Sequence, residues 1–277
     1  LFDLSGHTDG GHGLATLGYK AAPVQLTGIG YMSTSGLKAV DYYLSDRFLD
    51  PPGEGDAHFS EKLLRLSHSH FCYTPFEKIF KSTVDWRPHE RPVFGCFNNS
   101  AKISDDMLRL WHTLLVRVPG AKLLLKAWKP ELLQRRAISL GYRQEEIEVR
   151  PMTLDYIHEY MDMDVALDTF PYTGGGTTCE AIYMGTPVVT LAGTRHGTRF
   201  GLSLLENVGL GELAANTPEE YVEKAAALAS DGELLAALHG NLRRMMQNSP
   251  VMDGRSYVRE VEAMYEEIWQ EWLDGGE

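Results

Sequence analysis

The chain has 277 residues, of which 43% are hydrophobic and 23% are charged, with a formal net charge of -12 at pH 7. This composition is ordinary for a globular protein of one large or two modest domains, and the acidic balance argues against nonspecific binding of nucleic acid or of an anionic membrane. No apolar run reaches the ~18 residues of a membrane span, and the start lacks the features of a signal peptide, so we expect a cytoplasmic protein that binds neither nucleic acid nor membrane.

The first predicted elements form part of an α/β half. Residues 1–4 have the pattern of the end of a buried strand, which predicts that further chain precedes them. Strands are also predicted at 24–30 and 42–44. Between these lies a loop rich in glycine and hydroxyl residues, directly after a strand, formed by Tyr31, Thr34, Ser35 and Gly36. Residues 1–85 are therefore predicted to be the carboxyl-terminal part of a half that is truncated upstream.

From residue 92 short apolar runs alternate with amphipathic stretches, which is typical of βαβ units around a parallel sheet. Strands are predicted at 93–97, 123–125, 147–149, 165–167 and 188–191. Helices are predicted after the N-cap residues Ser104, Thr153 and Thr217, at 132–140, and from Arg255 to the end as one long apolar stripe that must pack on a large surface. The linker is placed in 71–90, so residues 86–277 are predicted to form a Rossmann-like half with a carboxyl-terminal helix.

A glycine turn between the strands at 165–167 and 188–191 is the most informative motif. Gly174, Gly175 and Gly176 carry no Cβ that would keep a ligand away, and Thr177 and Thr178 stand where a helix begins. Free amides and the positive end of the helix dipole gather there, which favours a phosphate. Glu180, one turn into the helix, is placed to accept hydrogen bonds from hydroxyls of a sugar. A purely structural tight turn is the alternative.

Known phosphate motifs do not fit this turn. No Gly-Lys-Ser/Thr follows it, so it is not the loop of kinases and ATPases. Cys179 stands where a dinucleotide fingerprint has its third glycine, so that interpretation fails as well.

Two further loops contain candidate residues. Asn99 and Lys102 follow a predicted strand, at the carboxyl edge where parallel sheets bind ligands, and Lys102 is suited to neutralise a diphosphate. A solvated surface lysine is the alternative. His7 is a candidate base or sugar ligand because its pKa suits proton transfer, and a histidine that satisfies loop backbone is the alternative.

Other polar clusters are given the simpler interpretation. His68, His70 and Cys72 alternate along a probable strand, but a fourth zinc ligand is absent, so we expect no metal. The three cysteines are taken as reduced packing residues. The remaining candidates could meet a phosphate but are interpreted as surface charges: Arg195, His196 and Arg199.

Several blocks, taken in order, resemble the catalytic region of the O-GlcNAc transferases (glycosyltransferase family 41) over nearly the whole chain. The blocks are 22–31, 34–36, 41–42, 60–63, 97–98, 102–103, 167–169, 176–178 and 185–187. The resemblance is strongest to bacterial relatives that carry tetratricopeptide repeats upstream.

This resemblance implies an α/β fold of the GT-B type, in which two Rossmann-like halves hold a UDP-sugar in their cleft. It also implies inverting transfer of N-acetylglucosamine to serine or threonine hydroxyls of a protein acceptor, without a metal or other cofactor. Asn99, Lys102, Thr177 and Glu180 match family residues that meet the UDP, with the lysine at the diphosphate, and Ile29 and Gly30 match the strand end that approaches the sugar.

The chain also departs from the family pattern. Thr153 and Tyr156 stand where the family has a lysine and a histidine, and Gly175 stands where animal members have a histidine before the paired threonines. Two alternatives therefore stay open. One is another GT-B activity on a UDP-sugar, such as an epimerase, and the other is a noncatalytic interaction module. The oligomeric state is not predicted.

Overall fold

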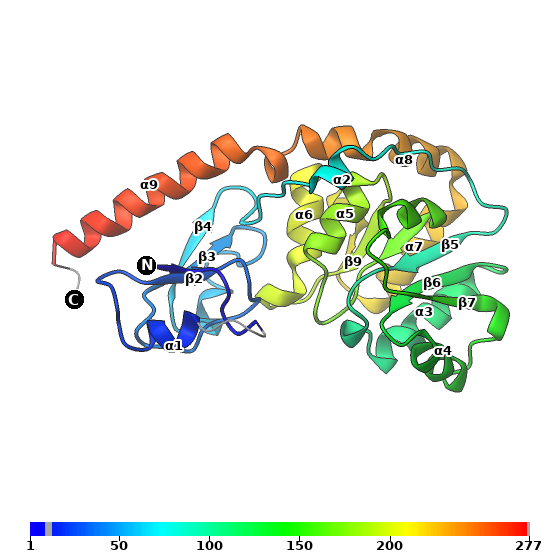
Figure 1. The fold of residues 1–277 in the computed structure, drawn as a ribbon, viewed down its shortest axis with the longest axis horizontal. Helices are drawn as coiled ribbons and strands as arrows, with labels where there is room; N and C mark the ends of the chain where they lie inside the picture. Colours follow the sequence, from blue (N-terminus) through cyan, green and yellow to red (C-terminus); the bar gives the residue numbers. More distant parts are fainter. Residues whose placement is uncertain (9–12, 276–277) are drawn as a thin grey trace.

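The computed structural model describes residues 1–8 and 13–275, which form two α/β halves arranged side by side (Figure 1). Over these residues the strands form two parallel sheets, one of four strands and one of six. The strands are β1 Phe2–Asp3, β2 Leu26–Gly28, β3 Tyr42–Asp46, β4 Lys62–Leu66, β5 Val93–Cys96, β6 Lys122–Ala127, β7 Ile147–Pro151, β8 Val165–Leu167, β9 Val188–Leu191 and β10 Ala214–Ala215. The helices are α1 Gly13–Leu17, α2 Glu77–Phe80, α3 Asp105–Arg117, α4 Pro130–Ser139, α5 Gly176–Tyr183, α6 Phe200–Val208, α7 Pro218–Ser230, α8 Gly232–Gln247 and α9 Gly254–Leu273.

The amino-terminal sheet has the order β1-β2-β3-β4. Its central strands are buried almost throughout, and Tyr43, Leu44 and Leu66 are almost fully buried. The prediction that the chain opens in a buried strand is wrong, because β1 lies at the edge of this sheet and the flanking Leu1 and Leu4 are 54% and 55% exposed.

The carboxyl-terminal sheet has the order β10-β9-β8-β5-β6-β7, and this order determines where a ligand can bind. From β5 the chain moves outward through β6 to β7, then returns to the other side of β5 with β8, which pairs with it in parallel. Such a reversal is a topological switch point, and the loops at the carboxyl ends of the two central strands diverge there to leave a crevice. All five predicted strands of this half are confirmed within a few residues.

Local capping signals fix several helix starts. The Ser104 hydroxyl accepts from the amide of Met107 at 3.2 Å, and the Thr217 hydroxyl accepts from Glu220 at 3.1 Å, so both predicted caps are confirmed. The predicted cap at Thr153 is wrong. Its hydroxyl donates to the Glu159 carboxylate at 3.2 Å, and the following helix is a short 3₁₀ segment, Ile157–Asp162.

Helix α9 leaves the carboxyl-terminal half and runs back along the amino-terminal sheet (Figure 1). Lys62 on β4 donates to Glu271 at 2.9 Å, the Tyr257 hydroxyl donates to the carbonyl of His70 at 3.1 Å, and Ile268 is buried. The predicted packing of the whole apolar stripe holds only in part, because Trp269 is 47% exposed. The proposed division between residues 85 and 86 lies in the segment that joins the halves and stays a prediction.

Two further expectations concern the described residues as a whole. Cys72, Cys96 and Cys179 are all free, and the last two are buried, as expected of packing residues. Across residues 1–8 and 13–275, none of the helices has both the length and the apolar character needed to span a membrane.

Candidate active site

The candidate site lies at the switch point between β5 and β8. The loop after β5 carries Lys102, at the end of a short 3₁₀ helix, and the loop after β8 carries the glycine turn that opens α5. Strands β5 and β8 are hydrogen-bonded neighbours, so these two loops start side by side. The two phosphate-binding candidates of the sequence, Lys102 and the glycine turn, are 72 residues or more apart in the chain and are therefore brought to one place.

The three glycines of the turn have different roles. A Cβ on Gly174 would lie 2.4 Å from the Thr178 hydroxyl oxygen and 2.7 Å from Oδ1 of Asn98, so this position has no room for a side chain. Gly175 is buried and occupies the N-cap of α5, where no side chain accepts from the first amides. Gly176 is exposed, and a Cβ there would meet nothing within 4 Å. The amino end of α5 thus opens to the outside at Gly176.

Asn98 and Asp168, which sequence reasoning did not select, hold this turn in place. Asn98 donates through its amide nitrogen to Asp168 at 3.0 Å and accepts from the hydroxyl of Thr177. Asp168 accepts from the Gly174 amide at 2.7 Å and from the Thr190 hydroxyl at 2.8 Å. Burial raises the pKa of the Asp168 carboxyl, while these hydrogen bonds oppose the rise. The signal available in the sequence was a polar residue directly after each buried central strand.

Two consequences follow for the predicted nucleotide contacts. The Thr177 hydroxyl donates to Asn98, so the group left to face a ligand at this position is its backbone amide. Asn99, the neighbouring residue, is exposed and caps the short 3₁₀ helix by accepting from the amide of Ala101 at 3.0 Å. The structure brings Asn98 rather than Asn99 against the glycine turn.

Lys102 reaches across from the β5 loop to the β8 loop. Its ammonium donates to the carbonyl of Thr173 at 2.9 Å and lies 3.7 Å from the centre of the Tyr172 ring. Burial lowers the pKa of Lys102, and the nearby carboxylate of Asp168 opposes that shift. A partly desolvated cation next to the open amino end of a helix is an arrangement that an anionic diphosphate would stabilise.

Glu180 faces two tyrosines. Its carboxylate accepts from the hydroxyls of Tyr156 at 2.8 Å and Tyr160 at 3.2 Å, and burial raises its pKa although both hydrogen bonds act in the opposite direction. Tyr156 is half-buried and occupies the position where the family resemblance predicts a histidine. The acidic residue is therefore held in place by protein hydroxyls, with its remaining lone pairs available to a ligand hydroxyl.

The amino-terminal half contributes a tightly fixed loop after β2. Ile29 has a left-handed backbone with φ of 69°, and a Cβ on Gly30 would lie 1.9 Å from the carbonyl oxygen of Leu4. The buried Glu61 accepts from the Thr34 hydroxyl at 2.6 Å and from the Ser35 amide at 2.7 Å. Gly36 is exposed, with φ of 72°.

His7 lies against this loop. Its Nε2 is 3.1 Å from the carbonyl oxygen of Ser35, and its ring meets that of Tyr31 edge-on with centroids 4.9 Å apart. A carbonyl only accepts, so Nε2 carries the hydrogen and Nδ1 of the neutral ring has the lone pair. This contact fits the simpler interpretation, in which the histidine satisfies loop backbone, and leaves one nitrogen for a further role.

A cavity of about 240 Å³ lies between the two halves, beside the candidate site. The amino-terminal half lines it with Tyr31, Met32, Ser33, His58 and Phe59, and the carboxyl-terminal half with Pro171, Tyr172, Arg195, His196, Gly197 and Thr198. Two contacts tie it to the phosphate-binding candidates. Tyr172 covers the ammonium of Lys102, and the methyl group of Met32 lies 3.8 Å from where a Cβ on Gly175 would be. The cavity therefore adjoins the glycine turn.

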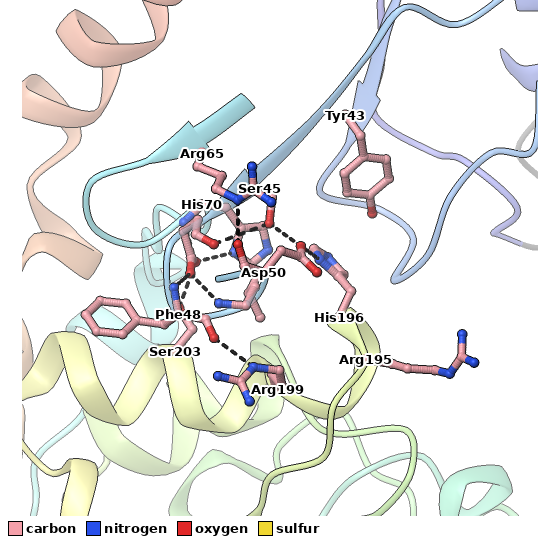
Figure 2. Close-up of polar contacts among 12 residues, drawn as sticks. Tyr43, Ser45, Phe48, Asp50, Arg65, His70, Arg195, His196, Arg199 and Ser203 are labelled. Carbon is pink, nitrogen blue, oxygen red and sulfur yellow. Dashed lines mark hydrogen bonds and ion pairs between the residues drawn. The ribbon is translucent and has the colours of Figure 1, made fainter. Parts of the chain in front are cut away.

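Arg195, His196 and Arg199, which are interpreted from the sequence as surface charges, differ in their burial. His196 is 3% exposed and bonded to Asp50 of the other half at 2.6 Å, while Arg199 donates to the carbonyl of Phe48 at 2.8 Å (Figure 2). The surface interpretation is wrong for His196 and partly wrong for Arg199. It holds for Arg195, which is exposed and points away from the polar network in Figure 2.

The three residues 68, 70 and 72 do not form a ligand set. Strand β4 ends at Leu66, before them, and the His70 Nδ1 is bonded to Asp46 at 3.0 Å. Within the part of the chain that the structure describes, no three histidine, cysteine or acidic side chains are grouped to hold a metal ion.

The fold is that of the GT-B class of glycosyltransferases. It has two halves, each with a parallel sheet, a cavity between them, and a final helix that returns to the first half (Figure 1). A helix whose amino end is suited to a phosphate begins at the switch point of the second sheet. The chain belongs to glycosyl transferase family 41, whose model matches residues 74–261.

Individual relatives agree with this assignment. The chain is 39% identical over 297 residues to the probable UDP-N-acetylglucosamine--peptide N-acetylglucosaminyltransferase SPINDLY of Solanum lycopersicum, covering 99% of this chain and 30% of that protein. It is 30% identical over 287 residues to the corresponding SEC protein of Arabidopsis thaliana, covering 97% of this chain and 29% of that protein. The chain thus spans less than a third of the length of these relatives.

Solved structures show the same fold. An O-GlcNAc transferase mutant of Thermobaculum terrenum superimposes with a TM-score of 0.88 at 36% identity, covering 99% of this chain and 53% of that one. The lipopolysaccharide glycosyltransferase WaaG matches with a TM-score of 0.51 at 14% identity, over 94% of this chain and 84% of that one, which is evidence for the fold alone.

Proposed function

We propose that this protein transfers N-acetylglucosamine from a UDP-sugar to serine or threonine hydroxyls of a protein acceptor. The observation that carries the proposal is the meeting of Lys102 with the open amino end of α5, next to a cavity between the halves. The arrangement fits a diphosphate at the helix start and a sugar in the adjoining cavity. Membership of family 41 and the names of the relatives support the same donor and acceptor.

In the proposed reaction an acceptor hydroxyl oxygen attacks the anomeric carbon while the bond from that carbon to the diphosphate oxygen breaks. The bonding electrons leave with UDP, and the configuration at the anomeric carbon inverts. Lys102 and the amides at 176–178 would stabilise the charge that develops on the departing diphosphate, where fixed donors contribute most. The family resemblance implies that this charge is met without a metal ion.

The hydroxyl proton needs an acceptor. His7 remains a candidate, since its Nδ1 carries the lone pair when Nε2 donates to the carbonyl of Ser35. The loop that His7 contacts through Ser35 also contains Gly30 and Tyr31, and Tyr31 lines the cavity. Thr34 and Ser35 would keep that loop in position through Glu61, and Gly36 through its amide on the Thr34 hydroxyl, rather than by touching the sugar.

The test is mass spectrometry of acceptor proteins incubated with the full-length protein and one donor at a time. The donors are UDP-N-acetylglucosamine, UDP-glucose, UDP-galactose and a GDP-sugar. We expect the mass of N-acetylhexosamine on serine or threonine with the first donor. Release of a free epimerised sugar would favour the epimerase alternative, transfer from the GDP-sugar alone would contradict the uridine assignment, and failure to bind UDP at millimolar concentration would favour a noncatalytic module.

A further inference from the structure

A buried polar network joins the two halves beside the cavity. On the amino-terminal side are Asp46 at the end of β3 and Asp50 in the turn after it, and on the other side are His196 and Ser203. Figure 2 shows Asp50, His196 and Ser203 of this network. His196 donates through Nδ1 to Asp50 at 2.6 Å, and Ser203 donates to Asp46 at 2.7 Å. Both aspartates and His196 are at most 3% exposed, so every contact in this network forms away from water.

The position of the hydrogen on His196 follows from this geometry. The Asp50 carboxylate accepts, so Nδ1 of His196 carries a hydrogen. Burial lowers the pKa of His196, although Asp50 opposes that shift, which keeps the ring neutral and leaves Nε2 as a hydrogen-bond acceptor. Among the described residues Nε2 has no partner, although it is buried. An acceptor in that condition is destabilising until a donor reaches it.

The cavity is the space from which such a donor can come. His196 lines it together with His58 of the other half, whose buried Nδ1 also lacks a partner within residues 1–8 and 13–275. Phe59, Tyr31 and Tyr172 supply aromatic walls. A cavity with apolar ring faces and a few unpartnered polar atoms suits a compact ligand that carries several hydroxyl groups.

His70 provides an internal comparison. It is also buried, also bonded through Nδ1 to an aspartate, and its ring centroid lies 5.8 Å from that of His196. Its Nε2 likewise has no partner among the described residues, but His70 does not line the cavity. The two histidines therefore differ in that only His196 lines the cavity.

Resting on the function proposed above, we propose that His196, oriented by Asp50, accepts a hydrogen bond at Nε2 from a hydroxyl group of the donor sugar. The cavity adjoins Lys102 through Tyr172, so the group that follows a bound diphosphate enters it. His196 would then help to select the transferred sugar, and its link to Asp50 would make that contact depend on both halves being correctly seated.

The experiment compares the binding of UDP with that of UDP-N-acetylglucosamine by calorimetry in the full-length protein. His196→Asn keeps an amide that can donate to Asp50 but has no group at the Nε2 position, and His70→Asn is the matched control. We expect His196→Asn to weaken the binding of UDP-N-acetylglucosamine about ten-fold relative to the binding of UDP, as for the loss of one buried hydrogen bond. The control should leave the ratio of the two dissociation constants unchanged.

Deoxy donors test the same contact without relying on a folded variant. UDP-N-acetylglucosamine analogues that lack the 3-, 4- or 6-hydroxyl are titrated into the unmodified protein, and one of them should bind about ten-fold more weakly. In His196→Asn that analogue should bind as well as the parent donor, because the histidine that accepts from the missing hydroxyl group is already absent.

Three results would overturn the assignment of His196. The first is that no deoxy analogue binds more weakly than the parent donor to the unmodified protein, and the second is that such an analogue loses the same affinity in His196→Asn. The third is that both asparagine variants change the affinity for UDP-N-acetylglucosamine relative to UDP by the same factor. In all three cases UDP itself still binds. Loss of UDP binding in the unmodified protein would instead contradict the proposed function itself.

Discussion

Gly174 and Gly176 stand in the same turn but have opposite surroundings. A Cβ at Gly174 would collide with Thr178, whereas one at Gly176 would meet no protein atom. We therefore expect Gly174→Ala to lower the melting temperature. We expect Gly176→Val to leave it nearly unchanged and to weaken UDP binding, because the added methyl groups occupy the path to the α5 amides. Melting curves beside UDP calorimetry distinguish the two, and normal UDP affinity in Gly176→Val would count against the phosphate site.

Lys102 should matter for turnover more than for stability. Its contacts in the unliganded protein are one carbonyl and one aromatic ring, and its ammonium is partly desolvated. We expect Lys102→Ala to lower kcat about 100-fold or more, as for the loss of a donor to a charged leaving group, with a small change in melting temperature. Steady-state kinetics beside a melting curve checks this, and near-normal kcat would exclude the role.

At the residue scale, the sequence identified the types of group at the site better than their functions. The glycines, Lys102 and Glu180 were recognisable because they follow buried strands or begin a helix. Asn98 and Asp168 were missed because their role depends on a contact between loops about 70 residues apart. His196 was misjudged for a similar reason, since its partner Asp50 is 146 positions away and belongs to the other half.

Among the elements, the segment that joins the halves is fastened to α8 by a stacked pair. The Trp86 ring lies on that of His239, with centroids 3.9 Å apart and planes at 4°, and His239 Nε2 donates to the carbonyl of Asp164 at 2.9 Å. Burial lowers the pKa of His239 to about 4, from an ordinary value of 6.5. The folded protein therefore holds this ring neutral in a range where the unfolded chain protonates it.

The pH dependence follows from that difference. Above pH 6.5 both states are neutral and the group adds no pH dependence. As the pH falls from 6.5 to about 4, the unfolded chain binds a proton that the folded protein does not, so the free energy of unfolding decreases. The decrease approaches about 1.4 kcal/mol for each pH unit. Urea unfolding at pH 7 and pH 5 should show a smaller decrease for His239→Gln than for the unmodified protein, and equal decreases would contradict the assignment.

Elements were predictable where short-range signals dominate. The strands of the second half and the caps at Ser104 and Thr217 followed from apolar runs and hydroxyl residues at the N-cap. The cap at Thr153 failed because its hydroxyl joins the cluster of Lys126 and Glu159, which is a tertiary contact. The first strand was judged buried because the pattern of apolar residues does not show which strand lies at a sheet edge.

Over the whole molecule, α9 should stabilise the amino-terminal half through very few side chains. Ile268 is 4% exposed, whereas Trp269, the next residue, is 47% exposed. We expect Ile268→Ala to decrease the free energy of unfolding by about 2–4 kcal/mol, as for a large-to-small change in a core. We expect Trp269→Ala to decrease the free energy of unfolding by a clearly smaller amount. Denaturant unfolding of both variants checks this. A larger effect at Trp269 would mean that the outer face of α9 is covered in solution.

The two-domain GT-B architecture was accessible from the sequence because family motifs occur in order along nearly the whole chain, and the six-stranded sheet confirms the Rossmann-like second half. The way in which the halves meet was not accessible. The polar network of Asp46, Asp50, His196 and Ser203 consists of residue types that usually lie at the surface, and only their pairing across the interface makes burial favourable.

The proposed role of Lys102 and the amino end of α5 is to hold the diphosphate of a UDP-sugar. Calorimetry of UDP and of uridine, in the unmodified protein and in Lys102→Ala, measures this role without the sugar. We expect the unmodified protein to prefer UDP to uridine and Lys102→Ala to lose about 100-fold of this preference, while uridine binds equally to both. The same preference for UDP in both proteins, or no binding of UDP at millimolar concentration, would contradict it.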